Sequence, residues 1–228
     1  MMQHPYFKQH PFPLTKRKDR VTVCFGEEVR PSQRGKISIN SDPVVRLTNN
    51  KLALLETLDA AGLSVPGPIH GLKEFFKNDE FDAGRFDEVF QFPVQARRRD
   101  HTVHIENYRD LMEFILQKRG NDYAIHGLPA QFKRFHITMC NTIRETVVKT
   151  PFGMIHQGIV SSTIKVTPEI VKLTRDVYKA VPFDMGTIEL IQGEGEYEPL
   201  AVENISLAPN EKLVHLIEAA ISAKLANR

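Results

Sequence analysis

The order of β-prone runs and amphipathic helices is the feature that most restricts how this chain can fold. Short runs rich in Val, Ile, Thr and Phe follow one another directly, and helices separate groups of such runs. The expected order is β-β-α, an extended linker, β-β-α-β-β-β and then α-β-β-α. Groups of neighbouring strands interrupted by single helices are typical of an α+β fold.

Residues 49–62 (NNKLALLETLDAAG) carry the clearest helical pattern. Apolar residues recur here at helical spacing, namely Leu52, Leu55, Leu58 and Ala61. Asn49 or Asn50 can cap the start of this helix, and Gly62 can end it. The following segment, LSVPGPIHG, contains two prolines, which restrict themselves and the residues before them. We therefore predict a helix followed by an extended linker.

The middle of the chain is predicted to form a small antiparallel β unit that carries one helix. The helix covers 108–118 and stops at Gly120. Its apolar stripe consists of Leu111, Met112, Ile115 and Leu116. The polar segment 77–86 is expected to be a surface loop. The predicted strands are 92–97, 102–105, 123–127, 132–140 and 143–149.

Further β and helical patterns lie toward the two ends of the chain. Thr167 and Pro168 fit the N-cap and the first position of a helix. The turn-prone GEGEY segment separates two β runs and predicts a hairpin. These outer elements are strands at 20–26, 35–40, 185–192 and 198–206, and helices beginning at 168 and spanning 211–225.

Composition and charge exclude several classes of protein. The formal net charge of the 228 residues is only +2, so the whole protein does not require a nucleic-acid or anionic-membrane partner. Cys24 and Cys140 match no metal-ligand or redox spacing, which indicates a reducing compartment. The N-terminus lacks the apolar run of a signal peptide, and no run of 18 apolar residues occurs. We expect a soluble cytoplasmic or viral protein without a membrane partner.

The chemistry-bearing residues form a spaced series of cations followed by acids, while P-loop, Rossmann, zinc-protease and nucleophile-elbow motifs are absent. The cationic part comprises Lys51, Arg97, Arg98, Arg99, Arg134, His136 and Lys149, and the late hairpin carries Glu189, Glu203 and Asn204. Cations that neutralise phosphates and carboxylates that hold magnesium are what cleavage of a nucleoside triphosphate requires. Glu189 is the best single candidate, because a carboxylate inside the apolar run TIELI needs a cation, a metal or solvent.

Other interpretations of these residues stay open. The basic triplet Arg97 to Arg99 could contact nucleic acid, although the small net charge argues against this partner. His101, His104, His126 and His156 are interpreted as surface or turn histidines.

The order of these motifs resembles that of the ATP-grasp family over roughly residues 35–210. NNKLALLETLDAAGLSVPGPI is similar to the family's helix and Gly-apolar-Pro-x-Pro linker, and FPVQAR is similar to the lid strand that ends in a phosphate-binding cation. FKRFHI is similar to the Glu-Tyr-Arg-x-His strand of the bacteriophage and glutamate-ligase-like branch. FDMGTIELIQ and VENISLAP resemble the last hairpin, which carries an acid and then Glu-x-Asn.

The resemblance implies an ATP-grasp fold in three parts: a reduced N-terminal α/β subdomain with linker at 1–86, a lid subdomain at 87–149 and a C-terminal α+β subdomain at 150–228. It implies an ATP-dependent ligase that joins an unknown carboxylate to an amine or thiol through an acyl phosphate, in the cytoplasm of a host or in a phage particle. The implied phosphate-binding residues are Lys51, Arg97, Arg99 and Lys149. The implied ligands of Mg²⁺ are Glu189 with Glu203 or Asn204, and Arg134 and His136 are the implied catalytic residues. The last amphipathic helix could pack within the chain or on a second copy, so an oligomer remains an open alternative.

Three departures from the family pattern support an alternative, a catalytically degenerate nucleotide-binding or structural module. RRRDHTVH has no glycine where the family has a Gly-rich loop over the phosphates, and Phe132 stands in place of the Glu of the Glu-Tyr-Arg-x-His strand. Glu203 and Asn204 are adjacent rather than separated by one residue, so on a regular strand their side chains point to opposite faces.

The strand register of the last hairpin decides which of these two residues can join Glu189. With a loop at 193–196, Glu189 lies opposite Leu200 and shares its sheet face with Asn204. A slip of one residue places Glu203 on that face instead. The sequence leaves this register open.

Overall fold

The structure is a computed structural model that describes residues 21–23, 37–77, 80–81, 92–98, 101–129, 132–140, 155–157, 160–162, 167–193 and 195–203. For 21–23, 37, 77, 133–140, 155–157 and 160–162 the description covers the backbone only. The predicted strand at 143–149 and the predicted helix at 211–225 lie outside the described residues.

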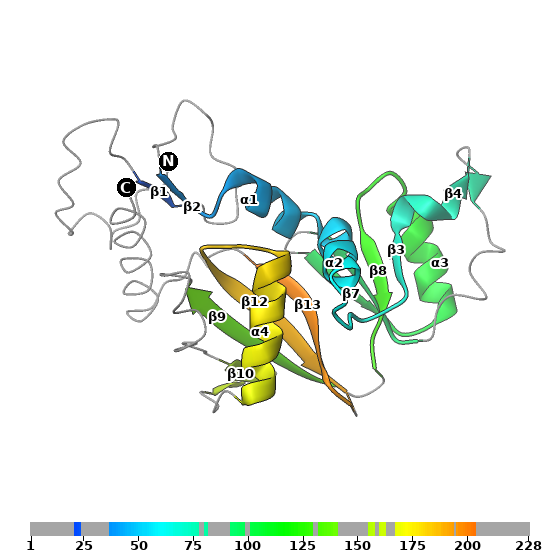
Figure 1. The fold of residues 1–228 in the computed structure, drawn as a ribbon. Coiled ribbons are helices and arrows are strands. Elements are labelled where there is room, and N and C mark those ends of the chain that lie inside the picture. The colour runs from blue at the N-terminus through cyan, green and yellow to red at the C-terminus, as the bar shows by residue number, and fades with distance from the viewer. Residues whose placement is uncertain are drawn as a thin grey trace.

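Two antiparallel sheets organise the described part of the chain (Figure 1). The four-stranded sheet has the order β3-β8-β6-β7, with β3 at Ile69–Gly71, β8 at Ala124–Gly127, β6 at Val94–Arg98 and β7 at His101–Ile105. The three-stranded sheet has the order β13-β12-β9, with β13 at Tyr197–Glu203, β12 at Met185–Gln192 and β9 at Lys133–Cys140. The α+β class and the late hairpin are confirmed.

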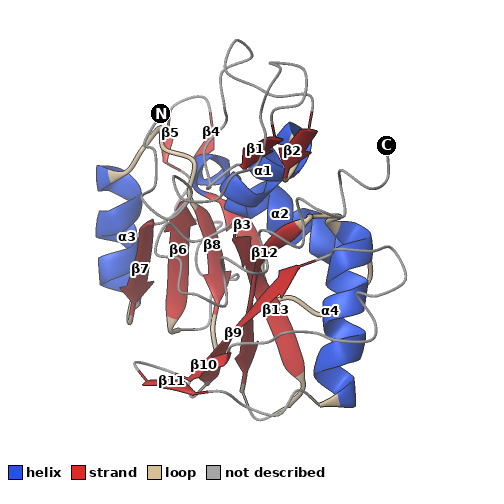
Figure 2. Cartoon of the chain, turned by 90° about the vertical axis from the view of Figure 1, so that its left-hand side faces the viewer, coloured by secondary structure: helices blue, strands red, loops and turns tan. Residues whose placement is uncertain are grey.

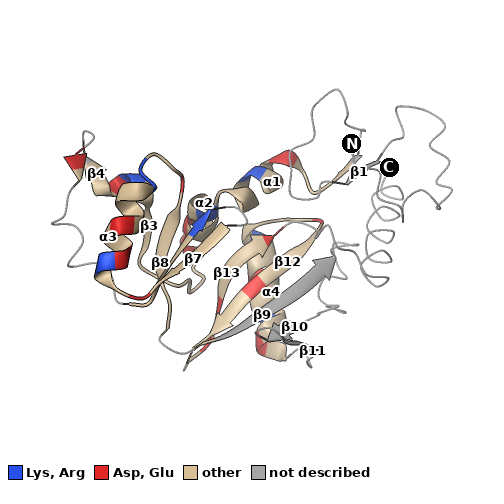
Figure 3. Ribbon diagram, turned by 180° about the vertical axis from the view of Figure 1, so that it is seen from behind, with Lys and Arg blue, Asp and Glu red and all other residues tan. Residues whose placement is uncertain are grey.

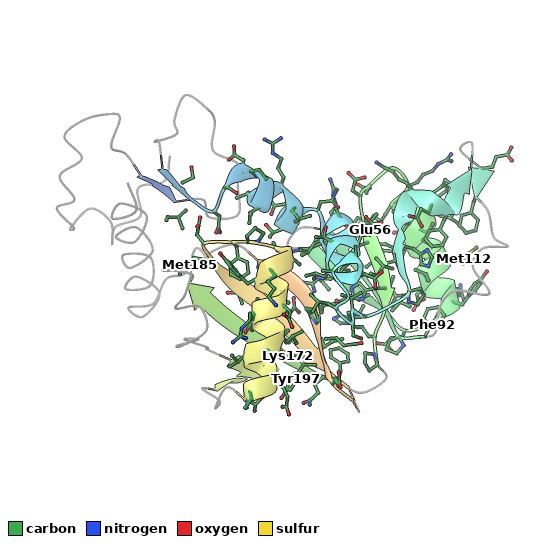
Figure 4. All side chains as sticks on the ribbon, in the orientation of Figure 1. Glu56, Phe92, Met112, Lys172, Met185 and Tyr197 are labelled. Atoms are coloured by element: carbon green, nitrogen blue, oxygen red, sulfur yellow. The ribbon has the colours of Figure 1, made fainter. Side chains whose placement is uncertain are left out.

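Each sheet buries one face against its own helix. Helix α3 (Tyr108–Gln117) packs on the four-stranded sheet through Leu111 and Ile115. Helix α4 (Pro168–Ala180) packs on the three-stranded sheet through Ile170 and Val177. In Figure 4, Phe92 and Met112 mark the first core, and Met185 and Tyr197 mark opposite ends of the β12–β13 hairpin. The faces away from α3 and α4 are therefore left for contact between the two sheets.

Two consecutive helices connect the two lobes of the molecule, which are the four-stranded sheet with α3 and the three-stranded sheet with α4. Helix α1 (Asp42–Asn49) ends at Asn50, whose side chain also caps helix α2 (Lys51–Ala60) by accepting a 3.2 Å hydrogen bond from the backbone N–H of Ala53. The prediction of α2 is confirmed, including its stop at Gly62, which has a φ of 78°. Helix α1 was not predicted. Helix α2 contacts β13 on one side and β3 and β8 on the other, as Figures 1 and 2 show.

Asn40 attaches this helical connection to the start of the hairpin. It has a φ of 58°, a region that Asn tolerates better than most residues, and its side chain is buried. Its Nδ2 donates to the carbonyl of Met185 at 2.6 Å, and its Oδ1 accepts from the N–H groups of Asp184 at 2.9 Å and Met185 at 3.1 Å. Asn40 thereby fixes where α1 begins relative to β12.

The sheet partner of β9 differs from the prediction. The segment 132–140 was expected in the same β unit as β6 and β8, but β9 pairs with β12 from Met185↔Cys140 to Gln192↔Lys133. The end of the predicted linker, β3, pairs with β8 and completes the four-stranded sheet. Period-two patterns fix which residues share a face of a strand and leave its neighbour unspecified, which explains the error.

Smaller elements complete the described chain. The predicted surface loop at 77–86 is wrong at its start, where β4 (Phe76–Lys77) pairs with β5 (Glu80–Phe81) and the rings of Phe76 and Phe81 lie 5.7 Å apart. The other small elements are the parallel pair β1 (Val21–Val23) and β2 (Ile37–Ile39), the 3₁₀ turn η4 (Leu72–Phe75), and the antiparallel pair β10 (Ile155–Gln157) and β11 (Val160–Ser162). Within the described ranges, no helix is both long enough and apolar enough to cross a bilayer.

Candidate nucleotide and metal site

Strand alternation on β6 directs Arg97 toward the other lobe. Val94 and Ala96 are buried in the core beneath α3. Gln95 and Arg97 occupy the opposite face, because neighbouring residues of a strand point to opposite sides. Arg97 is only 3% exposed there, which is rare for an arginine and requires a partner of opposite charge.

That partner is Glu189 on β12. Arg97 Nη2 donates a 2.6 Å hydrogen bond to Glu189 Oε2, and the two side chains are 4% and 2% exposed. Arg97 Nη2 also lies 3.6 Å from Glu203 Oε1 on β13, and Lys51 Nζ at the start of α2 lies 4.0 Å from the same oxygen. Figure 3 shows the acidic positions of β12 and β13 on their sheet beside α2. Four predicted site residues from four elements therefore meet between the two sheets.

A β-bulge brings Glu203 into this group. The hairpin loop covers 193–196 as expected, and Gln192 pairs with Tyr197. Glu189, however, pairs with Ala201 and not with Leu200, because the register shifts between Glu189 and Leu190. The shift by one residue puts Glu203, two residues after Ala201, on the same face as Glu189. The register that the sequence left open is therefore the one that places Glu203 on the face of Glu189, and a bulge produces it.

The guanidinium of Arg97 has donors that the ion pair does not use. Its Nε and Nη1 are buried and have no hydrogen-bond partner among the described residues. Buried N–H groups of a charged side chain are costly when unsatisfied, so they favour an acceptor supplied from outside the chain. A guanidinium offers its donors in a planar fork that matches the oxygens of a phosphate or carboxylate. The site is therefore suited to an anion next to the acidic pair.

Arg98, the next residue of the basic triplet, does not face this site. Arg98 points to the opposite face of β6 from Arg97, and its Nη1 donates to Asn121 Oδ1 at 2.8 Å. Nearby, a hydrogen bond from Lys73 lowers the pKa of Asp122, with the charges of Lys73 and Arg98 adding to the effect. Arg99 lies outside the described residues. Because β6 ends at Arg98 and β7 begins at His101, the connection is only two residues long.

The other sequence candidates are only partly placed. The register puts the backbone of His136 opposite Glu189 and that of Arg134 opposite Ile191. Lys149 and Asn204 lie outside the described residues. Arg134 and His136 therefore stay predictions with a known strand position, and Lys149 and Asn204 stay predictions from sequence.

Gln95 and His126 were missed by the sequence analysis. Both are fully buried, and they pair across β6 and β8 on the face that carries Arg97. Gln95 Nε2 lies 3.1 Å from His104 Nε2, and His126 Nδ1 lies 3.1 Å from the carbonyl of Gly127. The interpretation of His126 as a surface or turn residue is wrong. Its alternation with the buried Ile125 on a strand was the available signal, and it was ambiguous because β8 is covered on both faces.

Gly186 controls the approach of β13 to β12 beside Glu203. A Cβ at this position would lie 2.6 Å from the carbonyl oxygen of Glu203 and 3.3 Å from the ring of Phe183. We expect Gly186→Ala to lower the free energy of unfolding by about 1–3 kcal/mol, because backbone must move. Urea denaturation measures this change. Gly195→Ala is the control, since nothing lies within 4 Å of its Cβ. Equal stability of the two variants would show that the close approach is not constrained.

The acidic pair fits one magnesium ion that takes its other ligands from a substrate. No group of three or more His, Cys, Asp and Glu side chains in the described part of the chain could hold a metal. Mg²⁺ is commonly held by one or two carboxylates together with substrate phosphates. Glu189 and Glu203 already share one cation, the guanidinium of Arg97. Their arrangement therefore fits a metal that arrives with a phosphate compound.

Comparison with known proteins identifies the architecture. No protein-family model and no curated protein matches the sequence. A D-alanine–D-alanine ligase from Bacillus anthracis complexed with ATP matches with a TM-score of 0.62 and 11% identity, over 83% of this chain and 71% of that one. A RimK domain ATP-grasp protein from Sphaerobacter thermophilus matches with a TM-score of 0.63 and 14% identity, over 91% and 80%.

A third structure extends the comparison to a ligand complex. The ATP-grasp ligase PsnB, complexed with a phosphomimetic variant of its minimal precursor, Mg and ADP, matches with a TM-score of 0.54 and 15% identity. The match covers 82% of this chain but only 62% of PsnB, so this chain spans less than two thirds of that ligase. At these identities the likeness concerns the fold. The chain has the α+β architecture of ATP-grasp ligases, as the sequence resemblance implied.

Proposed function

We propose that this protein is an ATP-dependent ligase that activates a carboxylate as an acyl phosphate and transfers the acyl group to an amine or thiol. The observation that carries the proposal is the convergence of Arg97, Glu189, Glu203 and Lys51 between the two sheets. Two of these side chains are cations able to neutralise phosphates, and two are carboxylates able to hold Mg²⁺. The ATP-grasp fold supports the same assignment.

The described residues supply binding and charge neutralisation. Arg97 would direct Nε and Nη1 to phosphate oxygens, and Lys51 would add a second positive charge from the start of α2. Glu189 and Glu203 would hold Mg²⁺, which when bound draws charge from the phosphates of ATP. The burial of Arg97 and Glu189 keeps water from these charges and strengthens their effect.

The proposed reaction has two displacements. An oxygen of the substrate carboxylate bonds to the γ-phosphorus while the bond from that phosphorus to the ADP oxygen breaks, giving an acyl phosphate. An amine nitrogen or a thiol sulfur then bonds to the acyl carbon, inorganic phosphate leaves, and the attacking atom loses a proton. Arg134 and His136 are proposed to stabilise the first transition state, since the β9 register places their backbone beside the Glu189 strand.

The remaining parts of the proposal rest on the sequence resemblance. Arg99 and Lys149 are proposed as further phosphate ligands, and Asn204 as a further magnesium ligand. The subdomain limits 1–86, 87–149 and 150–228, the bacteriophage and glutamate-ligase-like branch, and a cytoplasmic or virion location are proposed on the same basis.

Calorimetry with ATP in the presence and absence of Mg²⁺ tests the proposal. We expect ATP to bind with Mg²⁺ and to bind at least about tenfold more weakly without it, because the phosphates and carboxylates repel each other. Glu189→Gln should remove most of this dependence. ADP release in a pool of amino acids then measures turnover. Absent nucleotide binding, or binding that Mg²⁺ does not change, would contradict the ligase.

A catalytically degenerate nucleotide-binding module is the alternative, and one observation favours it. The β6–β7 connection has only two residues, which leaves no room for a phosphate-covering loop at this place. A protein that only binds nucleotide would show Mg²⁺-dependent binding without ADP release for any carboxylate and amine supplied. ADP release dependent on both a carboxylate and an acceptor would exclude this alternative.

A further inference from the structure

The carboxylates of the candidate site are already neutralised by residues of this chain. Arg97 Nη2 lies 2.6 Å from Glu189 Oε2 and 3.6 Å from Glu203 Oε1, so one guanidinium nitrogen contacts both acids. Lys51 Nζ approaches the second acid to 4.0 Å. The guanidinium thus stands where a cation shared by the two carboxylates would stand.

We propose that Arg97 is a built-in counter-ion that competes with Mg²⁺ for Glu189 and Glu203 until nucleotide phosphates draw it away. The proposal rests on the proposed function, since it needs the same acids to hold metal and the same arginine to hold phosphate. Its new content is a coupling. Magnesium alone meets carboxylates whose charge Arg97 already neutralises, and phosphate alone meets a guanidinium whose charge the carboxylates already neutralise. When both ligands bind, each weakens the ion pair that opposes the other.

Burial makes this competition strong. The side chains of Arg97 and Glu189 are 4% and 2% exposed, so solvent screens their attraction poorly. A magnesium ion that arrives without nucleotide must share Glu189 with a positive charge at hydrogen-bond distance, or displace that charge into a buried region. Both routes weaken metal binding.

Phosphate oxygens can relieve the competition because Arg97 has unused donors. Its buried Nε and Nη1 have no hydrogen-bond partner among the described residues. A phosphate that accepts from this fork neutralises the guanidinium and loosens its hold on Glu189. Linkage requires the reverse effect to be equal, so metal on the acids strengthens phosphate binding by the same factor.

Magnesium titrated by calorimetry into the ligand-free full chain tests the inference. We expect Arg97→Gln to lower the Kd for Mg²⁺, measured without nucleotide, by about tenfold or more. Arg98→Gln is the matched control. It removes the same charge at the next residue of β6, whose side chain binds Asn121. It should leave the Kd unchanged. An unchanged Kd in Arg97→Gln, or an equal decrease in both variants, would overturn the inference.

A second measurement uses the wild-type protein in case Arg97→Gln does not fold. Sodium sulfate offers Arg97 a tetrahedral anion that holds magnesium weakly, and it should lower the Kd for Mg²⁺ several-fold relative to sodium chloride at equal ionic strength. No difference between the two salts would count against the counter-ion.

The two proposals fail in different ways. If MgATP does not bind the wild-type protein, the proposed function itself fails. If MgATP binds the wild-type protein but Arg97→Gln binds Mg²⁺ no better than Arg98→Gln, only the counter-ion inference fails.

Discussion

Arg97→Met is expected to lower the free energy of unfolding by about 3–5 kcal/mol, because it leaves the buried carboxylate of Glu189 without its 2.6 Å partner. Glu189→Leu should also destabilise the fold, because the buried guanidinium loses its 2.6 Å partner and keeps only Glu203, at 3.6 Å. Urea denaturation of both variants measures these changes. The free energy of unfolding should fall with urea concentration at the same slope as in the wild-type protein. Arg98→Met, which loses a hydrogen bond to Asn121 and a weak attraction to the exposed Asp122, should change stability by less than about 1 kcal/mol.

The double variant Arg97→Met/Glu189→Leu separates the cost of an isolated charge from the value of the pair. Replacing both members by apolar residues removes both buried charges, so the double variant should be clearly more stable than either single variant. Additive losses in the double variant would mean that the two side chains act independently, and would contradict the ion pair between the sheets.

Leu58→Ala is expected to lower the free energy of unfolding by about 2–5 kcal/mol. Leu58 is fully buried and joins α2 to the core that α4 and the hairpin share, so its truncation leaves a cavity there. Leu116→Ala is the control, since this leucine on α3 is 54% exposed, and its cost should stay below about 1 kcal/mol. Thermal and urea unfolding measure both variants. Equal losses would show that Leu58 is not part of a packed core.

Leu116 also shows how far helical periodicity could predict the core. The pattern placed Leu111, Met112, Ile115 and Leu116 on the apolar stripe of α3, and the structure buries Leu111, Phe114 and Ile115. The helix limits depend on local signals such as Asn107, which caps α3, and were predicted well. The width and centre of the buried stripe depend on which sheet the helix packs against. The sequence of the helix alone does not specify that sheet.

Some residues of the candidate site could likewise be predicted from the sequence, and others could not. The burial of Glu189 with a cation follows from a carboxylate inside an apolar strand, and the choice of Lys51 and Arg97 followed from the motif order and the family resemblance. Gln95 on β6 and His126 on β8 were not found, because both strands are buried on both faces and their alternation therefore gave an ambiguous signal.

The sequence by itself determined the α+β class, the limits of α2 and α3, the start of α4 and the hairpin, because caps, turns and periodicity act within a few residues. Motif order and the family resemblance added the candidate cations and acids. Only the tertiary structure decided that β9 joins the hairpin and that Glu203 shares the face of Glu189. Strand partners and a one-residue bulge depend on contacts between distant segments, and such contacts leave no local pattern in the chain. The same contacts bring Arg97 to Glu189 and Glu203, so both acids have a cationic partner within the chain before any ligand binds.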